Sequence, residues 1–485
     1  YGGDAVLSAL YEQFSFSLGA FSYDSDGWRP NNDLDQDIYN AYAQWAISPE
    51  LNVQVEYSSQ DTDQGDLAFN FDPDDFILNR RLETDRDSTR VGLRYSPAPG
   101  SNFLISYINS DRSEKESLED SFIDPDLLLL TTISDNTKLD TDGSLYEVQY
   151  LHQAERFNIV TGAGYSDSDT DIKGRFSVTI EGIGAVVDEP FDDEEEIEHS
   201  RVYSYANINS SQAVKWTVGA SYDDFKDQPI DETSFNPKFG VRWDVSDALQ
   251  LRAAAFKVLK PSLINNRTIE PTQVAGFNQF FDDTTGTESW RYGIAFDSRL
   301  RNNLSWGIEA TWRDMEQPNI LFGTEDTVTE DQEEQLHRVY VNWAPMDRVA
   351  LTADLIYDRF EDDAAKNEDF DSVPAKVETI SLPLGATYFH PNGWFAGISG
   401  TYVDQEVTRT QDSVYPQGDD NFFVTDVSVG YRLPKRLGIA SLGVINLFDE
   451  EFKYQDDSYR EFSEDATTGP YYPERIVMGR LTLNF

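Results

Sequence analysis

The chain has 485 residues, enough for two or three ordinary domains or for one large β-barrel. Its 88 acidic and 38 basic residues give a formal net charge of -50, which excludes nucleic acid as an expected partner because the phosphates would be repelled. The absence of cysteine excludes disulfides, thiolate metal sites and cysteine nucleophiles. Aromatic residues make up 13%, too many for a disordered acidic chain, so they are expected to pack on a folded surface.

The N-terminal residues show neither a strand pattern nor a targeting signal. They begin at Tyr1 and lack the basic and apolar regions of a secretory signal, so we expect any signal to have been removed. The chain also contains no apolar run long enough for a transmembrane helix. We expect residues 1–11 to be a short periplasmic N-terminal segment and residues 12–485 to form one domain.

From residue 14 onward, segments of alternating apolar and polar side chains follow one another. The pattern is clear at residues 14–18, 51–58, 304–313, 423–433 and 477–485. In a transmembrane β-barrel one face of such a segment meets lipid and the other meets the lumen. A soluble β-sandwich is the alternative, but its strands are shorter and carry fewer terminal aromatic residues. The alternation therefore favours a membrane barrel.

Long and short connections alternate along the chain between these segments. The long ones cover residues 24–36, 60–84, 110–140, 167–197, 223–233, 258–286, 314–332, 359–375, 404–420 and 449–473, and the short ones include 48–50, 97–100, 302–303 and 391–393. This predicts an all-β fold, a transmembrane antiparallel β-barrel of about 20 strands, in the range of roughly 18–22 and with an even number. Long loops would be extracellular, short turns periplasmic, and both termini periplasmic.

Aromatic residues lie where these strands are expected to meet the lipid headgroups. Tyr57, Tyr107, Tyr165, Tyr222, Tyr357 and Tyr402 fall at the expected outer ends, and Trp45, Tyr95, Trp243, Trp343 and Trp394 at the inner ends. Such rings have an apolar body and a polar tip, which suits the membrane boundary. Chance placement of aromatic residues in strands is the alternative.

The C-terminal residues resemble a known family. Residues 426–432, 443–450 and 480–485 read DVSVGYR, GVINLFDE and RLTLNF. They resemble the end of TonB-dependent receptor barrels, where an Asn-Leu-Phe-Asp segment precedes the last loop and a terminal Phe ends the chain. The resemblance implies an outer-membrane channel or transporter in lipid and lipopolysaccharide. It also implies that Phe485 is the signal read by the barrel-assembly machinery.

The resemblance does not extend to the plug domain that those receptors carry inside the barrel. Only about eleven residues precede the alternation, so the barrel is expected to be plugless as given. An inward loop, such as 167–197 or 258–286, or a separate plug, periplasmic or extracellular protein would then fill the lumen. A looser resemblance to barrels that export polysaccharide or other polymers leaves an exporter or secretion conduit as an alternative. A surface scaffold whose loops bind an extracellular partner is another.

Extending the alternation inward predicts a lumen lined by arginines. The candidates are Arg90, Arg94, Arg242, Arg252, Arg291, Arg299, Arg313, Arg338, Arg432 and Arg480, against the acidic candidates Glu56, Glu147, Asp297, Glu309, Asp354 and Asp426. We predict an acidic external vestibule above a locally basic channel wall, which would favour anionic or polar cargo. The alternative is that these arginines only pair with neighbouring carboxylates and stiffen the wall.

Acidic residues recur at alternate positions in several of the expected loops. Asp24, Asp26, Asp61, Asp63, Asp66, Asp167, Asp169 and Asp171 are candidate Ca²⁺ ligands, because this ion prefers several oxygen ligands. No segment completes the EF-hand pattern, and solvated loop charge is the alternative. No other cofactor is predicted. The four histidines, His152, His199, His337 and His390, lie in no nucleophile or metal motif, so no enzyme is predicted.

Overall fold

The computed structural model describes residues 1–123, 129–280, 283–320, 327–363, 373–410, 413, 415–459 and 469–485. Within these residues, 21 strands form a single sheet. The strands are β1 (Gly2–Tyr11), β2 (Phe14–Ser25), β3 (Leu34–Ala46), β4 (Leu51–Gln64), β6 (Arg81–Ala98), β7 (Ser101–Ile123), β8 (Leu130–Gln153), β9 (Phe157–Ile180), β10 (Gly184–Asn209), β11 (Val214–Asp227), β12 (Ile230–Ser246), β13 (Leu249–Leu259), β16 (Glu288–Arg301), β17 (Leu304–Ile320), β18 (Thr327–Met346), β19 (Val349–Asp362), β20 (Lys376–Phe389), β21 (Trp394–Thr408), β22 (Gly418–Arg432), β23 (Gly438–Ile445) and β25 (Ile476–Leu483).

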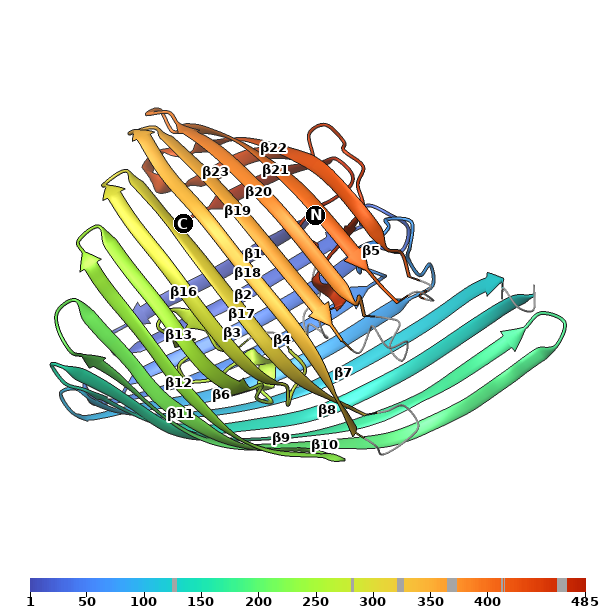
Figure 1. The fold of residues 1–485 in the computed structure, drawn as a ribbon, viewed down its shortest axis with the longest axis horizontal. Coiled ribbons are helices and arrows are strands. Elements are labelled where there is room, and N and C mark those ends of the chain that lie inside the picture. Colours follow the sequence, from blue (N-terminus) through green and yellow to red (C-terminus); the bar gives the residue numbers. More distant parts are fainter. Residues whose placement is uncertain are drawn as a thin grey trace.

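Each strand of this sheet pairs antiparallel with the next one in the chain, in an up-and-down order. Figure 1 shows the sheet curving round into a barrel. Short turns gather at one end, which we call the turn end. Longer connections gather at the other, which we call the loop end. The predicted antiparallel β-barrel is confirmed.

The strand count differs from the prediction in one place, at the N-terminus. Twenty strands were expected from residue 12 onward and are present as β2 to β25, but residues 2–11 form the additional strand β1. Leu7 lies opposite Leu18, and Tyr11 lies opposite Phe14. The alternation rule missed β1 because its apolar residues stand next to one another. The described sheet therefore has an odd number of strands, although the total lies in the predicted range.

The additional strand also changes where the first residue lies. Tyr1 donates its amino group to the backbone carbonyl of Asp24, at the loop end of β2. The last strand finishes beside Gly438, at the turn end. Residues 1 and 485 thus lie at opposite ends of the barrel. The expectation that both would be periplasmic is wrong, because one more strand reverses the direction of the chain once more.

The two faces of the sheet differ sharply in chemistry. Val202 is 54% exposed on the outer face, whereas its neighbours Arg201 and Tyr203 are buried on the inner face. Eight of the predicted boundary aromatics are exposed, namely Tyr57, Tyr165, Tyr222, Trp45, Tyr95, Trp243, Trp343 and Trp394. An apolar outside and a polar inside are typical of a barrel in lipid. Among the residues described, no helix has the length and apolarity needed to cross a membrane.

Four strands extend far beyond the others at the loop end. β7 to β10 contain 23, 24, 24 and 26 residues, whereas about 9–11 residues suffice to cross a bilayer. Figure 1 shows them projecting as a curved arm, in cyan and green. The predicted loops 110–140 and 167–197 are therefore mostly strand. The prediction failed because serine, threonine and aspartate dominate these segments and give no apolar alternation.

Candidate functional site: a loop bound inside the barrel

Residues 260–280 and 283–287, which the structure describes between β13 and β16, fold back against the inner face of the sheet. We call them the inner loop. They contain the 3₁₀ turn η1 (Ile264–Asn266) and a small hairpin made of β14 (Gln273–Val274) and β15 (Phe277–Asn278). Polar contacts reach from Glu56 of β4 to Arg313 of β17, so the loop crosses much of the wall. Of the two segments offered for an inward loop, 258–286 is confirmed over its described residues, whereas 167–197 lies mostly in β9 and β10.

Apolar contacts anchor the inner loop at two points. Ile264 packs against Ile108 and Leu145 of the wall. Farther along, the hairpin residues Val274 and Phe277 pack with Ala254, Phe256, Val258 and Ala295. The Phe277 ring lies directly on Gly293, where an added Cβ would come within 2.5 Å of the ring. A glycine in a strand often marks such a close approach, and here the absence of a side chain lets the β14–β15 hairpin pack against β16.

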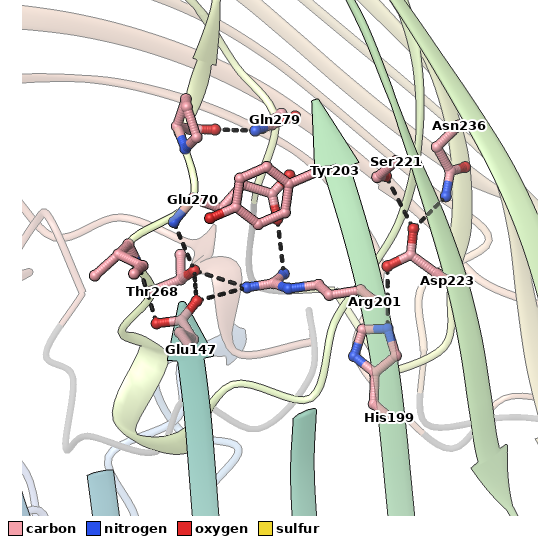
Figure 2. Close-up of polar contacts among 12 residues, drawn as sticks. Glu147, His199, Arg201, Tyr203, Ser221, Asp223, Asn236, Thr268, Glu270 and Gln279 are labelled. Atoms are coloured by element: carbon pink, nitrogen blue, oxygen red, sulfur yellow. Dashed lines mark hydrogen bonds and ion pairs between the residues drawn. The ribbon is translucent and has the colours of Figure 1, made fainter. Parts of the chain in front are cut away.

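A buried ion-pair network joins the middle of the inner loop to β8 and β10. Figure 2 shows Arg201 reaching from β10 toward the loop, with Glu147 of β8 beside it. The Arg201 guanidinium lies 3.1 Å from carboxylate oxygens of both Glu147 and Glu270, and all three side chains are at most 3% exposed. Arg201 also donates to Thr268 Oγ1 at 2.7 Å, and the Ile269 amide donates to Glu147 at 3.0 Å. Wall and loop therefore share one charge cluster.

Tyrosine and glutamine side chains complete this cluster. The Tyr205 hydroxyl donates to Glu270, and Gln149 donates to the Ile269 carbonyl. Gln149 also donates to the Tyr203 hydroxyl at 2.9 Å. Each buried carboxylate thus has several donors, which a buried charge requires.

A second buried cluster lies beside the first, on β10, β11 and β12 (Figure 2). His199 Nε2 lies 3.1 Å from Asp223 Oδ1, while Asn236 and Ser221 donate to Asp223 Oδ2 at 2.7 and 2.9 Å. These four side chains are buried. They belong to the wall alone, so this part of the interior is held together whether or not the inner loop is bound.

A third ionic contact fixes the C-terminal part of the inner loop. Asp283 contacts Arg291 of β16 at 3.0 Å and also pairs with Arg313 of β17. Arg313 in turn lies 2.8 Å from Glu334 of β18. Arg252 of β13 donates to the Gly276 carbonyl at 3.3 Å, and its guanidinium lies over the Phe277 ring. The loop is therefore held at both halves by arginines of the wall.

The Asp283 contact is expected to make the inner loop sensitive to acid. Burial alone would raise the pKa of Asp283, but the guanidinium groups of Arg313 and Arg291 lower the pKa below its ordinary value. A carboxylate with a lowered pKa stabilises the folded state above its ordinary pKa of about 3.9, and this contribution is lost as the pH falls through the folded pKa. Proteolysis of the loop should therefore accelerate below about pH 4. Asp283→Asn should be cleaved faster at neutral pH and show a weaker pH dependence; an unchanged pH profile in this variant would contradict the assignment.

The other long connections form a separate assembly at the loop end. Phe69 and Phe452 pack with Phe422, and β5 (Asn70–Phe71) pairs with β24 (Tyr454–Gln455). Arg29 is buried beneath them and donates to backbone carbonyls of the 65–80 connection. The 3₁₀ turn η4 (Asp457–Tyr459) follows β24 in this assembly. The 3₁₀ turn η3 (Pro434–Arg436) lies at the turn end, between β22 and β23. The described parts of the 65–80 and 446–475 connections thus support one another at the loop end.

The predicted lumen arginines fall into groups by their contacts. Arg252, Arg291 and Arg313 contact the inner loop, as described above. Arg242 and Arg338 pair instead with Asp244 and Asp354, at 3.9 and 2.5 Å. Arg432 lies over the Phe389 ring. The ion pairs agree with the alternative that arginines stiffen the wall, and the role of the set in lining a channel stays a prediction.

The remaining predicted arginines have no ion pair within the described ranges. Arg299 and Arg480 are exposed near the turn end, and Arg90 and Arg94 line a cavity in the wall. Phe485 is also fully exposed at the turn end, and its role in barrel assembly stays a prediction.

The candidate Ca²⁺ ligands are not brought together. Asp66 is buried between Arg29 and Arg80, at 3.7 and 3.5 Å, so its charge is already compensated. Asp167, Asp169 and Asp171 occupy alternate positions of β9, and Asp61 and Asp63 occupy alternate positions of β4. Among the side chains described, no group of three or more acidic or histidine residues is arranged to hold a metal ion. Calcium at these residues, or at Asp24 and Asp26, stays a prediction.

Sequence reasoning missed the residues that hold the inner loop. Arg201, Glu270 and Asp283 were not among the candidates. Arg201 carried a usable signal, because it alternates with His199, Tyr203 and Tyr205 on one face of the chain. Glu270 and Asp283 carried none, since their contacts depend on how the loop folds back.

Fold and interior together define a large β-barrel of the outer-membrane type, with one of its own loops bound inside the lumen. The family described as "TonB dependent receptor-like, beta-barrel" matches residues 7–286, and the chain belongs to it. The resemblance inferred from the C-terminal residues is thus confirmed. Proteins of this family lie in the bacterial outer membrane. No curated protein sequence matches the chain.

Solved structures show the same fold. The ferripyoverdine receptor of the outer membrane of Pseudomonas aeruginosa superposes with a TM-score of 0.71 at 14% identity, over 99% of this chain and 69% of that chain. The ferric citrate transporter FecA has a TM-score of 0.69 at 14% identity, over 100% and 75%. The copper transporter OprC has a TM-score of 0.69 at 13% identity, over 100% and 79%. At these identities the similarity is one of fold.

Proposed function

We propose that this barrel passes polar or bulky cargo across the outer membrane and that the inner loop closes its lumen. The loop end would face the cell exterior and the turn end the periplasm, as in other outer-membrane barrels. The observation that carries the proposal is the inner loop itself. It is bound to the wall from β4 to β17 by buried ion pairs, where a barrel of this size would otherwise leave a wide aqueous channel.

The contacts of the inner loop suit a closure that can open. Ion pairs and hydrogen bonds dominate its attachment, and water can replace these when the loop lifts. The apolar anchors are limited to Ile264 and to the β14–β15 hairpin. Domains and loops that move are drawn from such weakly packed regions. The family match and the similar fold of two transporters support the proposal that lifting of the inner loop lets cargo pass.

The arm formed by β7 to β10 favours a second function, binding of an extracellular partner. Its tip exposes apolar side chains, including Ile123 and Ile183 at 68% and 63% exposure. The described residues of the arm, 111–123, 129–142 and 167–198, are strongly acidic in the sequence. Deleting the tip of the arm would separate the two functions. If the deletion abolishes binding of a surface partner and leaves the flux unchanged, partner binding belongs to the arm.

A disulfide between loop and wall tests the transport proposal. The chain has no cysteine, so an introduced pair cannot be confused with native thiols. Ser110 Oγ of β7 lies 3.2 Å from Asn265 Oδ1 of the inner loop, which makes Ser110→Cys with Asn265→Cys a suitable pair. In proteoliposomes, we expect the oxidised pair to pass a polar solute several-fold more slowly than the same protein after reduction.

The matched control places a disulfide within the wall. Ser8 and Ser17 lie opposite each other in β1 and β2, with their hydroxyls 2.8 Å apart, in a part of the sheet remote in sequence order from β13 and β16. Oxidising Ser8→Cys with Ser17→Cys should leave the flux unchanged. Equal flux through the oxidised and reduced Ser110–Asn265 pair would show that the inner loop does not close the route.

A further inference from the structure

A cavity of about 240 Å³ lies in the inner wall between the inner loop and the turn end. Its lining comes from β3, β4, β6 and β7, and Ile269 of the inner loop covers one side. The polar lining residues are Gln44, Asn52, Gln54, Arg90, Arg94 and Ser106. The cavity thus combines two guanidinium groups, three amides and a hydroxyl, with no carboxylate among its lining residues, in a chain of net charge -50.

Two buried donors in this cavity lack a hydrogen-bond partner within the described part of the chain. Ser106 is only 4% exposed, and its hydroxyl has no hydrogen-bond partner. The buried Nε of Arg90 has none either. Nor does Arg90 or Arg94 form an ion pair with any residue that the structure describes. Buried polar groups are nearly always hydrogen-bonded, so a group of orphaned donors around one cavity points to a missing acceptor.

The inner loop explains why Arg90 is unpaired. Glu56 lies directly opposite Arg90 in the β4–β6 ladder, where the two would be expected to pair. The Glu56 carboxylate instead lies 2.5 Å from Arg267 of the inner loop. Binding of the loop therefore engages the carboxylate opposite Arg90 and leaves the Arg90 guanidinium available to a ligand.

The backbone places the donors around one point. Arg90, Gly92 and Arg94 alternate along the inner face of β6, and Ser106 of β7 lies opposite Gly92. A side chain at position 92 would collide with Gln54, because an added Cβ would lie 2.8 Å from Gln54 Cγ. Glycine thus keeps open the space flanked by the two guanidinium groups and the hydroxyl.

We propose that this cavity binds one small acidic sugar or a similar polyhydroxylated anion. Its oxyanion, a carboxylate or a phosphate, would accept hydrogen bonds from Arg90, Arg94 and Ser106. The amide oxygens of Gln44, Asn52 and Gln54 already accept hydrogen bonds from Tyr42 or Gln44, so its hydroxyls would accept from the amide nitrogens of Asn52 and Gln54. The volume lies below the roughly 300–1,000 Å³ of pockets for drug-sized ligands, which limits the ligand to about one sugar ring. The proposal rests on the transport function only in placing the site on the cargo route.

Titration calorimetry on the purified full chain in detergent tests this site. Glucuronate and glucose 6-phosphate supply the two oxyanions, and glucose supplies the hydroxyls alone. We expect saturable binding of at least one anion and none of glucose; the stronger of the two anions identifies the oxyanion. Arg90→Gln with Arg94→Gln should weaken binding at least about tenfold, because charge-assisted hydrogen bonds are lost. Ser106→Ala should weaken it less.

Arg299→Gln is the matched control. It removes one inner-face arginine near the turn end that does not line the cavity, so the affinity should stay unchanged. The proposal is overturned if neither anion binds saturably, if glucose binds as well as the anions, or if Arg299→Gln weakens binding as much as the cavity variants. Binding is measured without flux, so a failure of the disulfide experiment would leave this result standing, and the reverse also holds.

Discussion

Removing the inner loop is expected to open the barrel. Replacing residues 262–284 by a short glycine-serine linker deletes the contacts of Thr268, Glu270 and Asp283 with the wall. Barrels of 16–18 strands already contain an aqueous channel, and this sheet has 21 strands. Single-channel conductance in a planar bilayer should therefore rise on the order of tenfold over that of the intact chain.

The arm supplies a control deletion of similar length. Lys115 and Lys138 lie directly opposite each other in β7 and β8, so a tight turn can replace residues 116–137; this also removes the pairs that residues 131–137 make with β9 in the outer part of the arm. This deletion lies outside the lumen and should leave the conductance unchanged. If the inner-loop deletion conducts no better than the control, some other part of the protein closes the lumen.

Arg201→Met is expected to cause the largest loss of stability. The substitution would leave the Glu147 and Glu270 carboxylates buried without their shared cation. Removing one partner from a buried ion pair costs about 3–5 kcal/mol. Denaturant unfolding of the purified barrel, followed by tryptophan fluorescence, should show a loss of this size in the free energy of unfolding.

Two further variants separate charge burial from general damage. Arg338→Met removes another inner-face arginine, but this one is about half exposed and pairs with the single carboxylate Asp354 among the described residues, so about 0–1 kcal/mol is expected. Adding Glu147→Gln and Glu270→Gln to Arg201→Met removes the uncompensated charges and should restore part of the lost stability. No recovery in this triple variant would mean that packing around Arg201, and not its charge, holds the loop.

The barrel was predictable because lipid imposes a two-residue period on every strand that crosses it. Strands such as β17 and β25 show that period in residues 304–313 and 477–485, and the structure confirms them. Beyond the membrane the constraint disappears. The outer halves of β9 and β10 pair as regularly as the membrane-spanning halves do. Both of their faces contact water, however, so their sequence lacks apolar alternation and resembles that of a loop. The strand β1 was not predicted for a related reason, because its apolar residues do not alternate with polar ones.

Within the lumen, the sequence predicted which wall residues face inward but not the loop residues that contact them. Alternation placed Arg291 and Arg313 on the inner face, which follows from the strand period alone. Their partner Asp283 comes from a loop whose path depends on many distant contacts, and no local pattern marks it. The same limit applies to the cavity at Arg90, because its lack of a partner follows from Arg267 binding Glu56.

The attachment of the inner loop to β13 and β16 has a kinetic consequence. A closing element that is covalently joined at both ends cannot diffuse away after an opening, and short flexible tethers hold such an element at an effective concentration of about millimolar or above. Resealing is then a first-order event that does not depend on the abundance of any second molecule. The outer membrane would leak only for as long as each passage lasts.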